Sequence, residues 1–219
     1  MSPTGPDGAA TDGGPPSFDA SFAGVLAGRR MCRDYLADPV PDSVLQRVLA
    51  AAFRGPSAGN THALDLVVLT GDDTARHWDL TLADGQRDDF PWPGLLLAPV
   101  LVEVIVDPGA YVERYGRADK ARTGLGAGPD AWDVPFWFVD GGAAVMSMLL
   151  AAEADGLGAL LFGLFENERA LLDALGVPSD RRAVGTVALG WPAPGGRHPS
   201  RSARTGRPVA ADHVHTGGW

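Results

Sequence analysis

The chain has 219 residues, 45% of them hydrophobic, and a formal net charge of −9. This length and apolar content suit one domain with a substantial core and argue against a chain that is disordered throughout. The negative charge disfavours nucleic acid and anionic membrane surfaces as partners, because their phosphate groups would repel the protein.

Cysteine content and hydropathy predict a cytoplasmic protein that does not enter a membrane. The single cysteine, Cys32, cannot form an internal disulfide, which fits a reducing compartment. We expect its thiol to pack as a small, partly buried hydrophobic group. The longest apolar run, residues 139–152, is interrupted by Asp140 and paired glycines, so it predicts no membrane span. The N-terminus lacks the basic start and apolar stretch of a signal peptide.

The first half of the chain predicts a tail, two helices and two strands. Residues 1–17 are rich in Gly, Pro and small polar types and predict a flexible tail, with the folded domain over 18–219. A first long helix is expected over 42–55, with Asp42 or Ser43 as its cap. The elements expected next are a strand at 64–71, a helix at 74–82 and a strand at 98–108.

The second half predicts an excursion, then two helices and two strands. Residues 109–138 combine glycines with aromatic residues and show no sustained period, which is typical of an irregular functional loop or lid. Residues 139–156 are apolar nearly all round and predict a helix buried on more than one side. The remaining expected elements are a short strand at 159–163, a helix at 167–176 that begins near Asn167, and a strand at 183–192. This order of elements indicates a mixed α/β or α+β sandwich.

Arginines gather at two distant places in the sequence. One group precedes the first long helix and the other lies near the C-terminus: Arg29, Arg30 and Arg33, then Arg197, Arg201, Arg204 and Arg207. Guanidinium groups match phosphate geometry in bidentate fashion, so the two groups could enclose one anionic ligand. Composition alone favours a simpler interpretation, solvated charge that offsets the carboxylates. Neither a Walker loop nor the G-x-G-x-x-G loop of dinucleotide-binding folds is present.

A second candidate segment, GPSAGNTH at residues 55–62, links the first long helix to the first strand. Pro, Ser, Gly and Asn are what any turn at this place would use. The segment also offers backbone N–H groups, a hydroxyl and an amide that both donates and accepts, which suits the mixed polar edge of a planar heterocycle. Both interpretations stay open at this point.

Taken in order, the fragments resemble the FMN-dependent nitroreductase family. RRMCRDY, PSAGNTH ahead of a strand, APVLVEVIV, GLGALLFG, VALGWP and GRPVAADHVH follow the family's order and spacing from about Ser21 to Trp219. The resemblance implies an α+β fold, a three-layer sandwich with a mostly antiparallel central sheet flanked by helices. It also implies an intertwined homodimer that binds FMN where two chains meet. Residues 193–219, which have no core of their own, would wrap the partner.

The resemblance assigns cofactor-binding roles residue by residue. The basic positions that hold the FMN phosphate and polar edge are matched by Arg29, Arg30 and Arg33, and the C-terminal phosphate ligand by Arg207. The strand that passes the isoalloxazine ring is matched by Leu161, Phe162 and Gly163. The segment that lines the flavin from the partner subunit is matched by Pro56, Ser57, Ala58 and Asn60.

Four positions depart from the family pattern. Met31 stands where many members have Ser, which leaves only its backbone to contact the ligand. His62, Ala63 and Leu64 replace the Gln, Pro and aromatic residue that usually follow the family's Asn. We expect no catalytic side chain and no metal, because the flavin supplies the hydride chemistry.

The function that the resemblance implies is an oxidoreductase with NADPH or NADH as donor. It would pass hydride in a ping-pong exchange to electron-poor small molecules such as nitroaromatics, quinones or related conjugated compounds. Two alternatives stay open. One is a flavin-dependent oxidase or dehydrogenase of a biosynthetic intermediate, and the other is a flavin-binding module without turnover.

Overall fold

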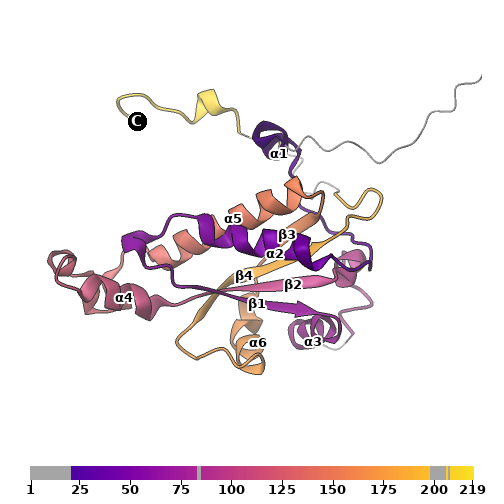
Figure 1. The fold of residues 1–219 in the computed structure, drawn as a ribbon, viewed down its shortest axis with the longest axis horizontal. Coiled ribbons are helices and arrows are strands. Elements are labelled where there is room, and N and C mark those ends of the chain that lie inside the picture. Colours follow the sequence, from indigo (N-terminus) through magenta and orange to yellow (C-terminus); the bar gives the residue numbers. More distant parts are fainter. Residues whose placement is uncertain (1–20, 83–84, 198–205, 207) are drawn as a thin grey trace, which may run out of the picture.

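The computed structural model describes residues 21–82, 85–197, 206 and 208–219. In this part of the chain, one antiparallel sheet lies between two layers of helices (Figure 1). This confirms the predicted α+β fold, a three-layer sandwich with an antiparallel central sheet. The predicted N-terminal tail, residues 1–17, lies outside the described residues.

The sheet has the strand order β1-β2-β4-β3, and every neighbouring pair is antiparallel. Its strands are β1 (Leu64–Thr70), β2 (Val100–Val106), β3 (Gly158–Phe162) and β4 (Arg182–Gly190). All four fall where runs of β-branched and apolar residues predict them. The strand β2 is buried along its whole length because helices cover both faces of the sheet there. The two edges are β1 and β3.

Helices cover both faces of this sheet (Figure 1). One face is covered by α2 (Asp42–Ala51) and α5 (Phe136–Ala154). The other is covered by α3 (Asp72–Thr81) and α6 (Glu168–Ala174). A short first helix, α1 (Phe22–Gly28), packs against α5. The two faces of the sheet therefore have separate core clusters.

The predicted helix starts lie close to the observed ones, but the capping differs. The N-cap residue of α2 is Pro41, which has no side-chain acceptor, so the predicted cap at Asp42 or Ser43 is wrong. Asp42 lies in the first turn instead, where a carboxylate favours the helix dipole. The helix α6 begins after Asn167 as predicted, yet the Asn167 side chain donates to the Thr81 carbonyl at 2.9 Å and does not cap the helix. That contact ties the start of α6 to the end of α3.

The helix α5 is apolar nearly all round and is buried on two sides, as predicted, while its remaining side exposes Phe136, Val139 and Met146. Ala144, Met148 and Ala152 belong to the core cluster between the sheet and α2. Among the described helices, α5 alone is long and apolar enough to cross a membrane, and this packing identifies it as a core helix. Gly141 brings the helix close to the sheet, since a Cβ there would overlap the side chain of Val184.

The prediction of irregular backbone over 109–138 is wrong at both ends. The helix α4 (Pro108–Gly116) occupies the first part, and α5 begins at Phe136. Only Pro108 and Tyr111 of α4 are buried, and its nine residues are too few for a sustained apolar pattern to stand out among the surrounding glycines. Between the two helices, three 3-10 turns fold round Trp132, whose Nε1 donates to the Leu125 carbonyl at 3.0 Å.

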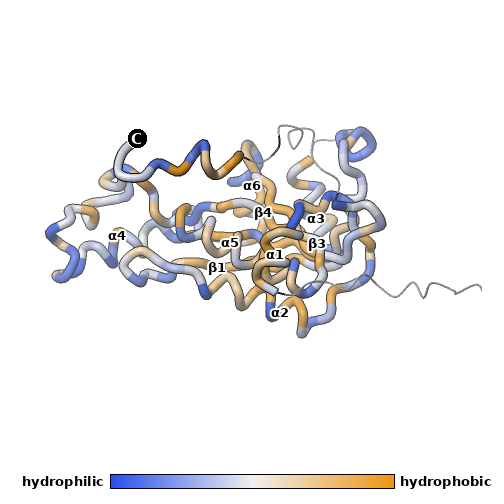
Figure 2. Tube along the Cα trace, turned by 90° about the horizontal axis from the view of Figure 1, so that it is seen from above, coloured by the Kyte–Doolittle hydropathy of each residue, from blue (hydrophilic) through white to orange (hydrophobic). Residues whose placement is uncertain are grey.

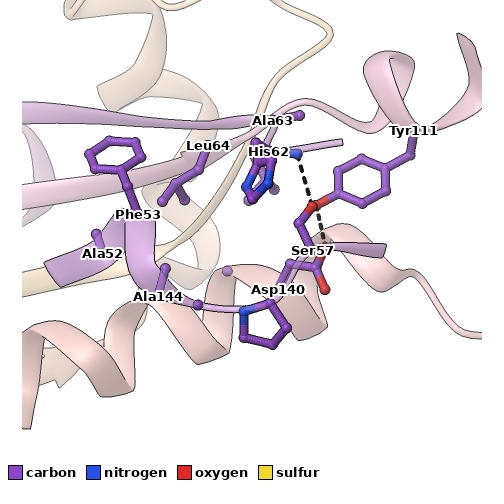
Figure 3. A pocket seen from close by; sticks show the side chains of 13 residues that line it. Ala52, Phe53, Ser57, His62, Ala63, Leu64, Tyr111, Asp140 and Ala144 are labelled. Atoms are coloured by element: carbon purple, nitrogen blue, oxygen red, sulfur yellow. Dashed lines mark hydrogen bonds between the residues drawn. The ribbon is translucent and has the colours of Figure 1, made fainter. Parts of the chain in front are cut away.

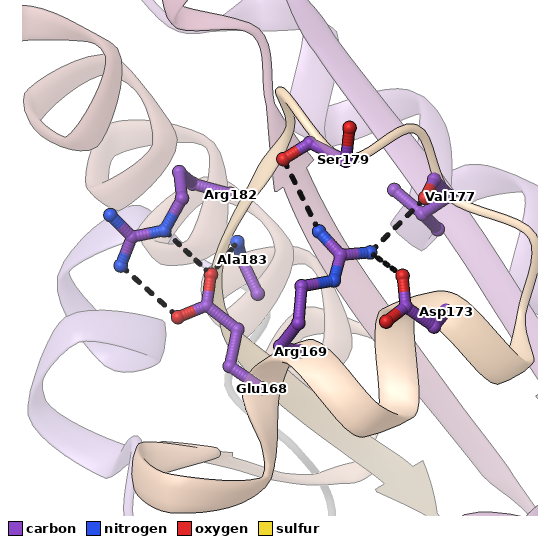
Figure 4. Close-up of polar contacts among 7 residues, drawn as sticks. All are labelled: Glu168, Arg169, Asp173, Val177, Ser179, Arg182 and Ala183. Atoms are coloured by element: carbon purple, nitrogen blue, oxygen red, sulfur yellow. Dashed lines mark hydrogen bonds and ion pairs between the residues drawn. The ribbon is translucent and has the colours of Figure 1, made fainter.

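Ionic contacts fix α6 on the start of β4 (Figure 4). The Glu168 carboxylate accepts hydrogen bonds from Arg182 Nε at 2.8 Å and from Ala183 N at 2.9 Å. The hydrogen bond from Arg182, more than any other contact, lowers the pKa of Glu168 below its ordinary value. Arg169 is in the first turn of α6, and its Nη2 donates to the carbonyl of Val177, which lies beyond the C-terminal end of the helix, at 3.2 Å. Polar contacts therefore hold α6 to the sheet and to the loop that follows it.

The C-terminal extension divides into a packed part and an exposed part. Residues 193–197 lie against the arginine-rich segment, where Arg33 N donates to the Gly196 carbonyl at 3.0 Å. Residues 208–219 are exposed throughout and stand off from the body of the fold (Figures 1 and 2). The largely exposed hydrophobic side chains in this part are Val209, Val214 and Trp219. The predicted lack of a core thus holds for 208–219 and not for 193–197.

Two neighbouring glycines of α5 test the close packing of this helix on the sheet. Gly141→Ala should lower the free energy of unfolding by about 1–3 kcal/mol, because the added methyl group collides with Val184. Gly142 has no atom within 4 Å of an added Cβ, so Gly142→Ala should raise stability by up to about 1 kcal/mol through helix propensity. Urea unfolding measures both changes. Equal effects of the two substitutions would contradict this packing.

Candidate functional site

The arginine-rich segment, residues 29–33, runs beside the edge strand β3. Met31 forms a parallel bridge with Ala159, and Cys32 N donates to the Ala159 carbonyl at 3.0 Å. This close approach needs Gly158, because a Cβ there would lie 2.6 Å from Cys32 Sγ. Backbone contacts therefore hold the arginines next to the strand that contains the predicted flavin-facing residues.

The three arginines of this segment have different surroundings. Arg29 is half-buried, and its Nη1 atom is buried without a hydrogen-bond partner in the described part of the chain. Arg30 is exposed, and its Nη1 donates to the carbonyls of Ala27 at 2.7 Å and Arg29 at 2.8 Å. The Arg33 guanidinium lies 5.6 Å above the centre of the Trp92 ring. Because buried donors are nearly always paired, we expect the unpaired Nη1 of Arg29 to donate to an acceptor from outside the described chain, such as a ligand.

The two residues between these arginines point into the core. Cys32 is fully buried, and its Sγ donates to the Asp34 carbonyl at 3.2 Å. Burial raises the pKa of the Cys32 thiol, so it stays protonated and packs as a hydrophobic group. The Met31 side chain packs against the core clusters on both faces of the sheet. Met31 therefore serves packing, and its backbone serves the contact with β3.

A cavity of about 480 Å³ opens beside β3, and we call it the β3 cavity. Four residues predicted to contact the cofactor line it: Arg33, Leu161, Phe162 and Gly163. Much of the remaining wall is aromatic and consists of Trp78, Phe90, Trp92 and Phe165. Arg33 is the one charged residue among the described residues that line it. The size and lining of the β3 cavity suit a flat, largely apolar ring system that carries a polar or anionic group.

Sequence reasoning missed most of the aromatic wall, because it comes from α3 and the loop after it, far from the motifs. The rings of Trp78 and Phe162 stack with centres 5.5 Å apart and planes 14° apart. Phe90 and Trp92 meet edge to face at 6.1 Å. The available signal was the aromatic pair in DDFPWPG, residues 88–94, inside an otherwise polar stretch.

Phe165 stands at the mouth of the β3 cavity in an unusual conformation. Its φ is +42°, in the left-handed region, and its side chain is 90% exposed. Gly163 makes room for it, since a Cβ there would lie 3.0 Å from the Phe165 ring. Strained backbone of this kind concentrates at binding sites, which fits a mouth that meets a ligand.

The second candidate segment, residues 55–62, is a strained loop (Figure 3). Gly59, Asn60 and His62 have left-handed φ angles of +63°, +57° and +51°. Inside the loop, Ser57 Oγ accepts from His62 N at 2.9 Å (Figure 3). Asn60 Oδ1 lies 2.6 Å from His62 Nε2. The cavity beneath the loop measures about 30 Å³, which has room for water and not for a cofactor.

Side chains from α4 and α5 hold this loop in place. Asp140 Oδ2 accepts from the Tyr111 hydroxyl at 2.7 Å (Figure 3). The same oxygen accepts from Ala58 N at 2.8 Å. Arg114 Nε donates to the Gly59 carbonyl at 2.8 Å. Burial, and then the hydrogen bond to Asp140, raises the pKa of Tyr111 above its ordinary value, so the phenol remains a donor. Hydrogen bonds from two helices therefore brace the loop within the single chain.

The loop and the β3 cavity lie on opposite sides of the sheet. The loop packs on α5 and leads into β1, whereas α3 and β3 border the cavity. Three strand spacings, about 14 Å, separate the edge strands β1 and β3. The predicted residues Pro56, Ser57, Ala58 and Asn60 therefore lie apart from this cavity in one chain. Arg29, Arg30 and Met31 are also not among the residues that line it. Arg207 lies outside the described residues.

Comparisons with known proteins agree with this geometry. The sequence model of the Nitroreductase family matches residues 26–191. A Thermus thermophilus protein named NADH dehydrogenase is 31% identical over 188 residues, which cover 81% of this chain and 89% of the relative. The chloronitrobenzene nitroreductase of Comamonas testosteroni is 27% identical over 194 residues, which cover 76% of this chain and 85% of the relative. A Desulfovibrio desulfuricans protein described as a nitroreductase, solved in complex with FMN, has a TM-score of 0.62 at 26% identity and covers 85% of this chain and 91% of its own.

The pH dependence of the free energy of unfolding should report the hydrogen bond between Tyr111 and Asp140. Tyr111→Phe should lower the free energy of unfolding at neutral pH by about 1 kcal/mol, because Asp140 loses a donor. Wild-type stability should fall as pH rises above 10.0, because an unfolded phenol ionises there and Tyr111 resists. Urea unfolding between about pH 9 and 11 should show a shallower fall in Tyr111→Phe. Tyr115→Phe, in the same helix, is the control, and an unchanged slope in Tyr111→Phe would contradict the assignment.

Proposed function

Because this chain belongs to the nitroreductase family, we propose that it is an FMN-dependent oxidoreductase. NADH or NADPH is the electron donor, and the acceptor is an electron-poor small molecule such as a nitroaromatic, a quinone or a related conjugated compound. The names of the relatives and the FMN complex of the structural neighbour support both parts of the proposal.

The observation that carries the proposal is the lining of the β3 cavity. Arg33 is distant in sequence from residues 161–163, yet all of these predicted flavin contacts line one space of about 480 Å³. The aromatic wall offers ring faces to a planar system, and such pockets are the usual sites of small cofactors. An isoalloxazine ring has the shape and mixed polarity that this lining suits.

The surroundings of Arg29 support a phosphate at the end of this site. Its buried Nη1 has no partner in the described residues, and a guanidinium fork matches a phosphate group. Arg207 is proposed as a second phosphate ligand on the strength of the family motif alone. Arg30 takes a lesser part, because its Nη1 is already used by two backbone carbonyls.

FMN, when bound, supplies the hydride chemistry. The side chains of this site bind, orient and keep water out. Trp78, Phe90 and Trp92 would keep water away from a ring bound in the cavity, and Arg33 would supply a positive charge that stabilises negative charge on a reduced flavin. No acid or base from the chain is required for hydride transfer itself.

A second copy of the chain completes the site in this proposal. Loop 55–62 cannot reach the β3 cavity of its own chain, and an isologous dimer brings it to the cavity of the partner. Exposed apolar side chains near the loop, among them Phe53 and Val139, provide a surface for such contact. Residues 193–219 wrap the partner, and 109–138 form a lid over the acceptor. The buried free thiol of Cys32 fits a cytoplasmic enzyme.

The visible absorption spectrum tests the proposed function directly. The purified protein should show the two bands of bound FMN, lose them under anaerobic NADH or NADPH, and regain them on adding a nitroaromatic or a quinone. Bound flavin that neither nicotinamide reduces would favour an oxidase or a non-catalytic flavin module. A colourless protein that takes up no added FMN would contradict the proposal.

The two neighbouring arginines provide a matched pair for the phosphate contact. Arg29→Ala should weaken FMN binding by about 1.5–3 kcal/mol, or roughly 10- to 150-fold, because a desolvated charge-assisted hydrogen bond is lost. Arg30→Ala should weaken it less, since that guanidinium is exposed and already paired. Fluorescence titration with FMN measures both constants. A larger effect at Arg30 would contradict the assignment of Arg29.

Mixing two inactive variants tests whether the site is shared. If Arg29 and Asn60 of different subunits meet at one FMN, the Arg29→Ala and Asn60→Ala homodimers should both be impaired. Unfolding and refolding them together at equal concentration should restore about one quarter of the wild-type activity, because half of the dimers are mixed and one of their two sites is intact. No recovery would place both residues in the same chain's site.

A further inference from the structure

Behind the wall of the β3 cavity lies a buried polar cluster that the proposed reaction does not use. It consists of His77 of α3, Glu103 of β2 and Thr186 of β4, which are 1%, 0% and 0% exposed. Thr186 Oγ1 donates to Glu103 Oε2 at 2.7 Å. His77 Nδ1 lies 2.9 Å from Glu103 Oε1 but off the line of a hydrogen bond, so this is a close polar contact. His77 Nε2 is buried without a partner among the described residues.

The cluster belongs to one row of residues that crosses the whole sheet. Val67 pairs with Glu103, Glu103 with Thr186, and Thr186 with Phe162. Directly opposed residues of antiparallel strands point to the same face, so all four face α3. The row ends at Phe162 on the edge strand, and Phe162 lines the β3 cavity.

Aromatic contacts connect the cluster to the cavity. The His77 ring meets the Phe162 ring edge to face at 5.9 Å and the Trp78 ring at 4.8 Å. Trp78 and Phe162, which stack on each other, both line the cavity. On the backbone side, Gly185 allows a close approach, because a Cβ there would lie 2.6 Å from the Phe162 carbonyl oxygen. The polar cluster therefore packs beside the ring of Phe162. The lack of a side chain at Gly185 makes room for the carbonyl oxygen of Phe162.

Stability alone does not explain polar groups at this place. Burying a carboxylate and an imidazole is costly unless both are fully paired, and His77 Nε2 is not paired in the described chain. Apolar side chains of similar volume often stabilise a core as well or better. Unlike apolar contacts, directional polar contacts hold the side chains that they join in one defined arrangement.

We propose that His77, Glu103 and Thr186 are positioning residues that hold Phe162, Trp78 and the end of β3 in the geometry that the ring-binding cavity needs. They touch no ligand themselves. The consequence for catalysis rests on the proposed function, whereas the effect on β3 concerns the chain without ligand and can be measured independently.

Hydrogen exchange of the β3 amides, measured without FMN, tests the positioning role. Thr186→Val removes the hydroxyl at nearly constant volume, and the double change His77→Leu with Glu103→Met replaces the rest of the cluster by apolar groups. In both variants the amides of residues 161–163 should exchange about tenfold faster than in wild type. Val102→Ala is the control, because Val102 is equally buried in β2 but faces the opposite side of the sheet.

The outcomes separate this proposal from the proposed function. With FMN bound, the variants should keep their flavin, while kcat/KM for the acceptor falls about tenfold, since misplacement by a fraction of an ångström is costly. Wild-type exchange at 161–163 in both variants would overturn the proposal, as would an equal rise in Val102→Ala. If the wild-type protein bound no FMN, the function would fail and the exchange result would still decide the positioning role.

Discussion

One sheet separates the two groups of residues that a flavin site of this kind needs. The order β1-β2-β4-β3 places loop 55–62 at one edge and the arginine-rich segment at the other. The loop also packs on the α5 face, whereas the cavity opens on the α3 face. No side-chain motion spans that distance, and in the proposed site a second copy of the chain unites them. Under this proposal, the exposed apolar groups and the uncovered C-terminal extension are the surfaces that meet the second copy.

The fixed shape of loop 55–62 suits the proposed contact with a second chain. A loop that must fit another molecule gains affinity if its shape is fixed beforehand, because less conformational entropy is lost on association. Of the three residues in left-handed conformations, the two that are not glycine, Asn60 and His62, each cost on the order of 1–3 kcal/mol. Asp140, Tyr111 and Arg114 maintain that shape through hydrogen bonds to the loop or to one another. The strain is thus already present in the single chain.

The sequence predicted what depends on local pattern and missed what depends on contact across the fold. Strands and long helices carry periodic apolar runs, and their positions were predicted. The helix α4 has only nine residues and buries two of them, so its apolar pattern is too short to distinguish it from a loop. The unequal surroundings of Arg29 and Arg30 arise from how α1 ends, which composition does not encode. Glu103 was visible as a charge inside an apolar run, but its neighbour His77 lies in another element and could not be inferred.

The departures from the family pattern fall where the backbone makes the contact. Met31 lacks the usual hydroxyl, yet the segment is held to β3 by a backbone bridge and by the fit of Gly158, neither of which depends on that side chain. The N–H group and ring of His62 are used inside the loop, by Ser57 and Asn60. Backbone geometry and guanidinium charge therefore persist while side chains change. What remains free to set the preference for an acceptor is the aromatic lining of the cavity, in which the buried polar cluster holds the rings of Trp78 and Phe162 in place.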